Sequence, residues 1–419
     1  MRRPIFYGWI VVAVTAVVVL ATAGVRSAPG AFIVIMTQEP GWSTSAVSFA
    51  AAAGLVVFGL AGPLSGWLMG RVGVRAVVVA SLVITGLALL ATSLVREIWE
   101  LTFTFGLISG LGTGLVASVL GPTIATRWFV QRRGLVTGIL GASTSTGQLI
   151  FVPLLTGLAV VAGWRVGAVG LGVLALILVV PVILLVRGDP ADKGLRPLGV
   201  HDGEIVKVRA PDRGIMRRAI RTSDFWFLAG TFFVCGATSN GIVGQHFIPH
   251  AVDHGFTAVE ASAALAFMGV FNFVGTIGSG WLTDRWDPRR LLLIYYAFRG
   301  VSLFFVPFIH DAATIGAFAI LFGLDYIATV PPTVALAADR FGRHNVGIVY
   351  GWIFAAHMVG AAIAAWAAGV VRDSVGDYAA AFVAAGSLAM VAGFAALFIK
   401  RSAGGQVPRT PAASMEPSV

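Results

Sequence analysis

Long apolar runs alternate with short polar breaks along almost the whole chain. Each run has about 18–25 residues, the length that an α-helix needs to cross the hydrocarbon core of a bilayer. The pattern predicts an all-α membrane protein with twelve spans, over residues 8–34, 45–69, 76–95, 99–124, 135–158, 166–186, 224–249, 258–283, 291–308, 313–338, 346–370 and 378–399.

The composition agrees with lipid as the solvent. Of the 419 residues 57% are hydrophobic and only 11% are charged, whereas a soluble domain carries about a quarter charged residues. The net charge is +10, but the basic residues are scattered between apolar runs, so we expect no nucleic-acid partner. The single cysteine, Cys235, excludes a disulfide framework. We also expect no cofactor, no metal and a monomer.

The distribution of Lys and Arg predicts the orientation. With the N-terminus in the cytoplasm, the 29 basic residues all fall in cytoplasmic segments except Arg26, Arg96, Arg165, Arg299 and Arg372. Short cytoplasmic loops carry the excess of basic residues, so both termini are predicted to be cytoplasmic. The first apolar run is too long for a signal peptide and is expected to be retained. We therefore expect a multi-pass protein of the cytoplasmic (plasma) membrane, the inner membrane of a bacterial cell.

The chain contains an internal repeat. The stretch GWLMGR at residues 66–71 returns as GWLTDR at 280–285, and the same offset relates GWS at 41–43 to GFT at 255–257. Two parallel repeats of six helices are typical of transporters that bind substrate between the halves. The predicted domains are a six-helix bundle over 1–186, a basic cytoplasmic linker over 187–222, a second bundle over 223–401 and a disordered tail over 402–419.

The second copy resembles the signature G-x-L-x-D-R-x-x-x-R of the major facilitator superfamily. The resemblance covers the whole chain and implies that an acidic residue near a helix end and the following arginines latch a cytoplasmic gate. Gly70 stands where the first copy would carry its acid. The gate residues implied by the resemblance are Gly66, Arg71, Gly280, Asp284, Arg285 and Arg289.

Shorter motifs are similar to those of a narrower branch, the oxalate/formate antiporters and monocarboxylate transporters. They are FYGW at 6–9, GWS at 41–43, ATRWF at 125–129 with RRG at 132–134, and ADRFG at 338–342. In that branch a cation in the eighth span holds the substrate carboxylate, and Thr276 stands at its position here. The resemblance places His357 at a second family cation, in span eleven, and Arg26 at a lysine of the first span. It implies a small organic anion, similar to a monocarboxylate, as the substrate.

Ionisable groups at membrane depth are costly, so each one is a functional candidate. Arg26 lies roughly 25 Å along the first predicted span, and its planar guanidinium suits a carboxylate. Snorkelling of Arg26 to the outer interface is the alternative. The other candidate substrate-binding residues are His357, Asn240, Asn272, Thr276 and Gln148. Each of the uncharged ones could instead hold helices together.

Further ionisable residues are candidates for proton coupling. Arg299 and Asp325 fall near mid-depth on consecutive spans, either as a structural ion pair or with Asp325 as a proton carrier. His246, His250 and His254 recur every four residues and share one helical face. They could line a proton-linked cavity, make structural hydrogen bonds, or bind a metal, although no carboxylate or cysteine of the same span joins them.

These features favour a secondary active transporter of a small organic anion, driven by protons or by exchange, over an enzyme. No ATP-binding loop is present. An exporter of cationic drugs or metabolites is the alternative, but span five lacks the Pro of the antiporter motif and Arg26 repels cations. A non-transporting sensor would need a sizeable soluble domain, and a membrane-embedded hydrolase would need paired carboxylates or a metal cluster. The substrate, the direction and the coupling ion stay open.

Overall fold

The computed structural model of the protein describes residues 6–117, 119–199, 212 and 214–400. Within these residues, 12 helical segments are long and apolar enough to cross a membrane, which confirms the predicted number of spans. They are Tyr7–Met36, Thr44–Arg71, Val74–Thr92, Ile98–Trp128, Leu135–Ala162, Trp164–Leu185, Ser223–Asp253, Ala258–Thr283, Pro288–Phe308, Ala312–Phe341, Val346–Val375 and Ala379–Ala396.

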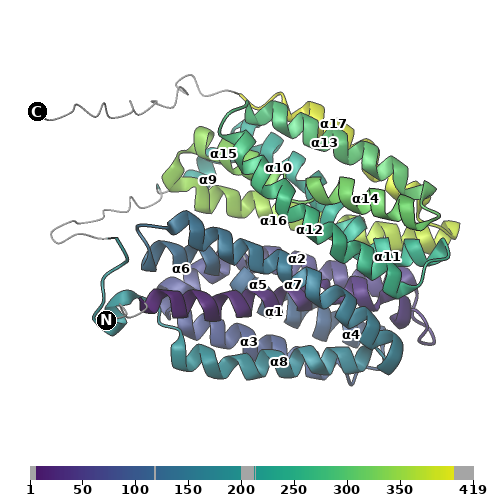
Figure 1. Cartoon of the computed structure of the whole chain (residues 1–419), viewed down its shortest axis with the longest axis horizontal. Helices are drawn as coiled ribbons and strands as arrows, with labels where there is room; N and C mark the ends of the chain where they lie inside the picture. Colours follow the sequence, from purple (N-terminus) through teal and green to yellow (C-terminus); the bar gives the residue numbers. More distant parts are fainter. Residues whose placement is uncertain (1–5, 118, 200–211, 213, 401–419) are drawn as a thin grey trace, which may run out of the picture.

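Two groups of helices lie one above the other in Figure 1. The N-terminal half contains α1 (Tyr7–Met36), α2 (Thr44–Arg71), α3 (Val74–Thr92), α4 (Ile98–Leu101), the π-helix η1 (Thr102–Ser109), α5 (Gly110–Ala117), α6 (Leu120–Trp128), α7 (Arg133–Ala162) and α8 (Trp164–Leu185). The C-terminal half contains α10 (Ser223–Gly236), the π-helix η3 (Ala237–Val243), α11 (Gly244–Asp253), α12 (Ala258–Thr283), α13 (Pro288–Phe305), η4 (Val306–Phe308), α14 (Ala312–Asp325), α15 (Val330–Phe341), η5 (Arg343–Asn345), α16 (Val346–Val375) and α17 (Ala379–Ala396).

The predicted linker and tail are described only in part. In the linker the structure shows the short 3₁₀ helix η2 (Pro190–Lys193) and α9 (Ile215–Ala219). Residues 200–211 and 213 of the linker and the tail from 401 lie outside the described residues. The domain boundaries therefore stay predictions.

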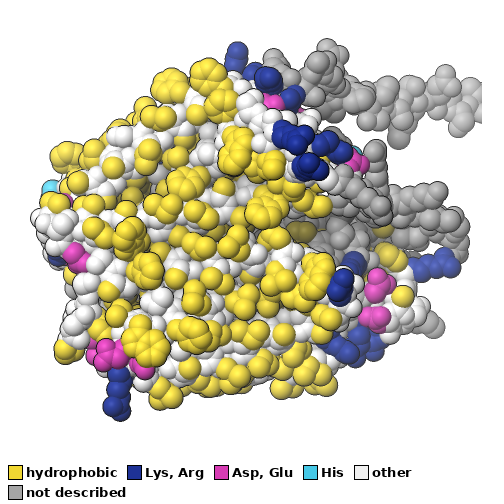
Figure 2. Space-filling view, turned by 180° about the vertical axis from the view of Figure 1, so that it is seen from behind, with side chains coloured by type: hydrophobic (Ala, Val, Ile, Leu, Met, Phe, Trp, Pro, Cys, Tyr) yellow, Lys and Arg dark blue, Asp and Glu magenta, His cyan; other side chains and the backbone are white. Residues whose placement is uncertain are grey.

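The start of α1 and the end of α17 lie on the same side of the bundle (Figure 1). The Tyr7 hydroxyl donates to the Leu185 carbonyl at 2.9 Å, and the Lys400 amide donates to Asp224 at 2.8 Å. We call this side the terminal end and the opposite side, where α1 ends and α2 begins, the far end. Figure 2 shows Lys and Arg side chains gathered mainly at the terminal end, beside a broad apolar belt. This distribution is the one expected if the terminal end is cytoplasmic, and the orientation remains a prediction.

The internal repeat of the sequence appears as the same turn in both halves. Gly41 (φ 80°) and Gly255 (φ 91°) both take left-handed backbone conformations before a helix, where a glycine carries no steric penalty. The next residue but one caps the helix: the Ser43 hydroxyl accepts from the Ala46 amide at 3.2 Å, and the Thr257 hydroxyl accepts from the Glu260 amide at 3.2 Å. The repeat therefore encodes the far-end turns that start α2 and α12.

Several spans differ from the predicted boundaries. The last turn of α16 continues to Val375 and includes Arg372, which we expected in a loop. In this added turn, beyond the apolar run, Arg372 forms a two-pronged salt bridge with Asp253, at 2.8 and 3.0 Å. Span ten is also not continuous, because α14 ends at Asp325 and α15 begins at Val330. The resulting break places Tyr326 beside the central cavity described next.

Candidate functional site

A cavity of about 330 Å³ lies between the halves, near the middle of the bundle and on the terminal side of it. Such a volume is at the lower end of what small-molecule sites show. Helices α1, α2 and α7 line it from one half, and α10, η3, α15, α16 and the break after α14 line it from the other. Its polar and titratable side chains are Thr22, Arg26, Thr144, Gln148, Cys235, Ser239, Asn240, Tyr326, Tyr350 and His357.

Arg26 is the charged group of this cavity. Its guanidinium lies 5.7 Å from the centre of the Phe58 ring. Among the described residues it forms neither a hydrogen bond nor a salt bridge, although it is half-buried. An isolated guanidinium at membrane depth is costly. The site is therefore poised to accept a negative group, and the aromatic face of Phe58 offsets part of the cost until one arrives.

Three polar side chains of the C-terminal half form a hydrogen-bonded chain facing Arg26. The Tyr326 hydroxyl donates to Asn240 Oδ1 at 3.3 Å, and Asn240 Nδ2 lies 2.9 Å from His357 Nε2. His357 Nδ1 lies 3.1 Å from the Phe232 carbonyl oxygen. A carbonyl can only accept, so Nδ1 carries the proton and, in the neutral ring, Nε2 accepts from the amide of Asn240. The whole chain is thus internally consistent with a neutral histidine.

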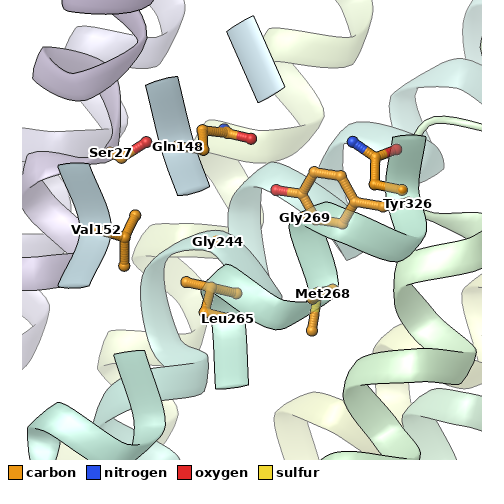
Figure 3. A pocket seen from close by; sticks show the side chains of 9 residues that line it. Ser27, Gln148, Val152, Gly244, Leu265, Met268, Gly269 and Tyr326 are labelled. Carbon is orange, nitrogen blue, oxygen red and sulfur yellow. The ribbon is translucent and has the colours of Figure 1, made fainter. Parts of the chain in front are cut away.

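A smaller pocket of about 40 Å³ adjoins the cavity (Figure 3). Gln148 and Tyr326 line both spaces, and Asn272 and Ser27 line only the smaller one. In Figure 3 the Tyr326 hydroxyl points toward the side on which Ser27 and Gln148 lie. Asn272 also donates to the Ser145 hydroxyl at 3.2 Å, which joins α12 to α7 across the halves.

Thr276 does not line either space. Its hydroxyl donates to Asn272 Oδ1 at 3.1 Å, one helical turn away, so the side chain orients Asn272. Thr276 had been expected among the substrate-binding residues because a family cation occupies that position. The structure instead gives it a supporting hydrogen bond.

Arg299 and Asp325 form an ion pair behind the cavity. Their side chains are 0% and 1% exposed, and Arg299 Nε lies 2.5 Å from Asp325 Oδ2. Arg299 Nη2 also donates to the carbonyls of Asp325 and Tyr326, at 2.8 and 3.2 Å, and Nη1 donates to Cys235 Sγ at 3.0 Å. The pair thereby fixes the break between α14 and α15 against α10. The guanidinium positions the backbone of Tyr326 without reaching the cavity itself.

The histidines of α11 lie away from the cavity. His246 Nε2 is 2.6 Å from the Ala365 carbonyl and His250 Nε2 is 3.2 Å from the Val306 carbonyl, so each ring ties α11 to another segment. Both side chains are at most 1% exposed, and neither lines the central cavity. In the part of the chain that the structure describes, no group of three metal-binding side chains occurs. The expected proton role of His246 and His250 has no geometric support here.

The predicted gate residues at the terminal end do not bridge the halves. Arg71 packs over Trp67 at 4.4 Å and Arg285 over Trp281 at 4.1 Å, each on its own helix. Arg289 pairs with Asp287 at 2.7 Å. Asp284 forms no salt bridge within the described residues. The two signature glycines are loosely packed: a Cβ added at Gly280 would meet open space, and one added at Gly66 would lie 3.8 Å from the Val119 side chain. The predicted latch is therefore not engaged in this structure.

The far end is closed by contacts between the halves. Gly30 of α1 packs so closely on the Gly244 carbonyl of α11 that a Cβ would overlap it. Asp373 of α16 accepts hydrogen bonds from the backbone amides of Thr44 and Ser45, at 3.3 and 2.8 Å, at the start of α2. A carboxylate at a helix N-terminus satisfies free amides and interacts favourably with the helix dipole. Asp373 is thus a cross-half latch that sequence reasoning missed.

Each half is also fastened internally at the far end. Glu39, after α1, pairs with Arg165 of α8 and accepts from the Trp164 indole at 3.1 Å. The Arg165 hydrogen bond holds the pKa of Glu39 below its usual value. In the other half Arg372 and Asp253 form the salt bridge noted above.

Aromatic side chains form much of the cavity wall and were also missed. Phe354 stacks on His357 with ring centres 5.6 Å apart, and Phe232 packs on the same imidazole at 4.6 Å. Tyr350 and Tyr326 complete this wall. In the sequence they are ordinary members of apolar runs, and the only available signal was that Tyr326 directly follows the intramembrane Asp325.

Comparison with known proteins places the chain among membrane transporters. The model of the Major Facilitator Superfamily matches residues 14–330 and 279–417. The chain is 27% identical to monocarboxylate transporter 13 of Rattus norvegicus over 385 residues, 91% of this chain and 86% of that protein. It is 26% identical to monocarboxylate transporter 11 of Mus musculus, over 94% and 88% of the two chains. A bacterial homolog of the human lysosomal transporter Spinster, in an inward-facing and unoccupied conformation, matches with a TM-score of 0.72 at 14% identity, over 96% and 100%.

Proposed function

The chain belongs to the major facilitator superfamily, and from that premise we propose that it carries a small monoanionic carboxylate across the membrane together with a proton. Members of this superfamily are multi-pass membrane transporters, so the chain is a transporter and not an enzyme. The proposal concerns the solute, its charge and the coupling ion. The names of the relatives, two monocarboxylate transporters, support the same solute class.

The observation that carries the proposal is the unpaired guanidinium of Arg26 in the cavity between the halves. The planar guanidinium of Arg26 would donate two parallel hydrogen bonds to a carboxylate, and the carboxylate would neutralise the positive charge of Arg26. Arg26 is the one permanent charge among the described residues that line the cavity. One fixed positive charge suits an anion with a single negative charge better than a dianion.

The two sides of the site belong to different halves, which suits alternating access. Arg26 lies on α1, whereas His357, Asn240 and Tyr326 belong to the C-terminal half. A carboxylate held by both sides would stabilise the states in which the halves approach each other around it. With the far end closed and the predicted terminal latch unengaged, we assign this structure to the state that exchanges solute at the terminal, cytoplasmic end.

The same charge argues against an exporter of cations. Positive solutes would meet Arg26 without a compensating carboxylate, since Asp325 is buried behind the cavity and paired with Arg299. We therefore do not propose drug export.

Uptake into proteoliposomes tests the proposal. The wild-type protein should accumulate labelled lactate when a pH gradient is applied and should not accumulate a cationic dye. Arg26→Ala should abolish lactate uptake, and Arg26→Lys should impair it, because an ammonium cannot reproduce the bidentate geometry. Arg221→Ala is a matched control, since Arg221 is exposed between α9 and α10, lies outside the cavity and is not one of the predicted gate residues. Normal lactate uptake by Arg26→Ala would overturn the proposal.

A further inference from the structure

The hydrogen-bonded chain from Tyr326 through Asn240 to His357 has a direction. The Tyr326 hydroxyl donates to Asn240 Oδ1 at 3.3 Å, and Asn240 Nδ2 donates to His357 Nε2 at 2.9 Å. At the end of the chain, His357 Nδ1 lies 3.1 Å from the Phe232 carbonyl oxygen. Because that oxygen can only accept, the hydrogen of the neutral ring is on Nδ1 and Nε2 is the acceptor. In this arrangement the hydrogen of the Tyr326 hydroxyl is committed to Asn240 and is not offered to the cavity.

We infer that Asn240 and Tyr326 relay the protonation state of His357 to the substrate carboxylate. This inference rests on the proposed function. When a proton binds at Nε2, that nitrogen becomes a donor and can no longer accept from the Asn240 amide. A half-turn of the Asn240 side-chain amide restores the contact, with Oδ1 accepting from Nε2–H.

The same half-turn reverses the bond to tyrosine. Asn240 Nδ2 now faces the Tyr326 hydroxyl oxygen and donates to it, so the hydroxyl hydrogen is released. Tyr326 lines the cavity together with Arg26, and its freed hydroxyl donates to a carboxylate held on Arg26. One N–H bond forms as the proton binds His357 Nε2, no other covalent bond changes, and one hydrogen bond to the anion is added.

Direct binding of the carboxylate to His357 is poorly served by the geometry. Both ring nitrogens already have partners, and the ring is packed between Phe354 and Phe232. His357 is only 5% exposed. A carboxylate would have to displace Asn240 to reach the imidazole, whereas the relay transmits the proton without moving the ring.

Several other titratable and charged groups lie around His357. The titratable and charged groups that face it from the neighbouring elements are Cys235 of α10, Tyr326 after α14, Tyr350 of its own helix and Arg26 across the cavity. Arg299 lies 3.0 Å beyond Cys235 and is paired with Asp325. The anion on Arg26 favours the protonated histidine, and the protonated histidine favours the anion, because such coupling is reciprocal.

Substrate affinity as a function of pH tests the relay. Lactate binding to the purified protein should weaken about tenfold or more between about pH 5.5 and about pH 8.5, the effect of losing a hydrogen bond to a charged group. Tyr326→Phe retains the ring and His357 but removes the relayed donor. Its affinity should stay near the wild-type high-pH value at every pH. Asn240→Ala interrupts the chain at its middle and leaves the Tyr326 hydroxyl free to donate at every pH. Its profile should also be flat, but near the wild-type low-pH affinity, and this variant serves if Tyr326→Phe folds poorly.

Tyr295→Phe is the matched control. Tyr295 lies on α13 and lines neither the cavity nor the smaller pocket, so the wild-type pH profile should remain. Proton uptake on lactate binding, measured in weak buffer, should accompany binding in Tyr295→Phe and be lost in Tyr326→Phe. A wild-type pH profile in Tyr326→Phe would overturn the relay and assign the coupling to the histidine charge acting through space. Lactate binding that is absent from the wild type, or that survives Arg26→Ala, would contradict the proposed function instead.

Discussion

Replacing Asp373 with asparagine should loosen the far end of the transporter. The carboxylate bridges the halves by accepting from the amides of Thr44 and Ser45, at 3.3 and 2.8 Å, at the first turn of α2. Asparagine retains one acceptor but loses the negative charge and one acceptor oxygen. The substitution removes the interaction of the charge with the helix terminus and one hydrogen bond. Because both are exposed to solvent, the far-end-closed state should lose about 1 kcal/mol of stability.

This loss acts only on states in which the far end is closed, because the bond exists only there. A destabilisation of about 1 kcal/mol changes the ratio of closed to open states by a factor of about five. A population that is mostly closed at the far end in the wild type should therefore acquire a clearly larger open fraction. The overall fold should be unaffected, since the bond joins two halves that are each packed internally.

Distances between spin labels across the far end measure this ratio. Suitable positions are Leu94 in the N-terminal half and Val375 in the C-terminal half, which are 79% and 63% exposed. The native thiol should first be removed by Cys235→Ser so that only the introduced cysteines react. Asp373→Asn should add or enlarge a longer-distance population in the double electron–electron resonance trace.

Asp377→Asn is the control for this experiment. Asp377 also lies at the far end, but its carboxylate accepts from the Ala379 amide two residues away, within one half. Its distance distribution should match the wild type. The latch would be refuted by an unchanged distribution in Asp373→Asn, or by an equal change in Asp377→Asn.

Two further predictions concern ion pairs. Asp325→Asn or Arg299→Met alone should lower the unfolding free energy by about 3–5 kcal/mol, because each leaves a buried partner uncompensated, and the double variant should recover most of the loss in a thermal melt. If Asp325→Asn instead folds normally and loses only proton-driven accumulation, Asp325 is a proton carrier and the structural role is wrong. Glu39→Gln should lower stability at neutral pH by about 0.5 kcal/mol, since the pair with Arg165 is partly exposed. The pKa of Glu39 is depressed in the folded protein, so its contribution is present above the unfolded-state pKa and is lost as the pH falls through the folded value. Melting temperatures of the variant and the wild type should therefore converge in acid; a constant difference at all pH values would contradict the assignment.

The sequence by itself determined the number of spans, the division into two repeats and which ionisable residues lie within the spans. These features depend on local composition, because an apolar run of membrane length has essentially one stable form in lipid. The pairing of Arg299 with Asp325 was accessible for a similar reason, since consecutive antiparallel helices bring residues of equal depth together. The two turns at the far end could also be predicted, because each repeat carries a glycine followed two residues later by a Ser or Thr that caps the next helix.

The composition of the site was decided by the tertiary structure. His246, His250 and His357 all lie within spans, but only His357 lines the cavity, because the rotation of each helix about its axis is set by packing against its neighbours. The break after Asp325 turns Tyr326 toward the cavity, and Arg299 holds it there through a hydrogen bond to the backbone. Asp373 meets Thr44 across 329 residues of sequence. Such contacts belong to the way in which the two halves meet, and no local pattern in either half encodes them.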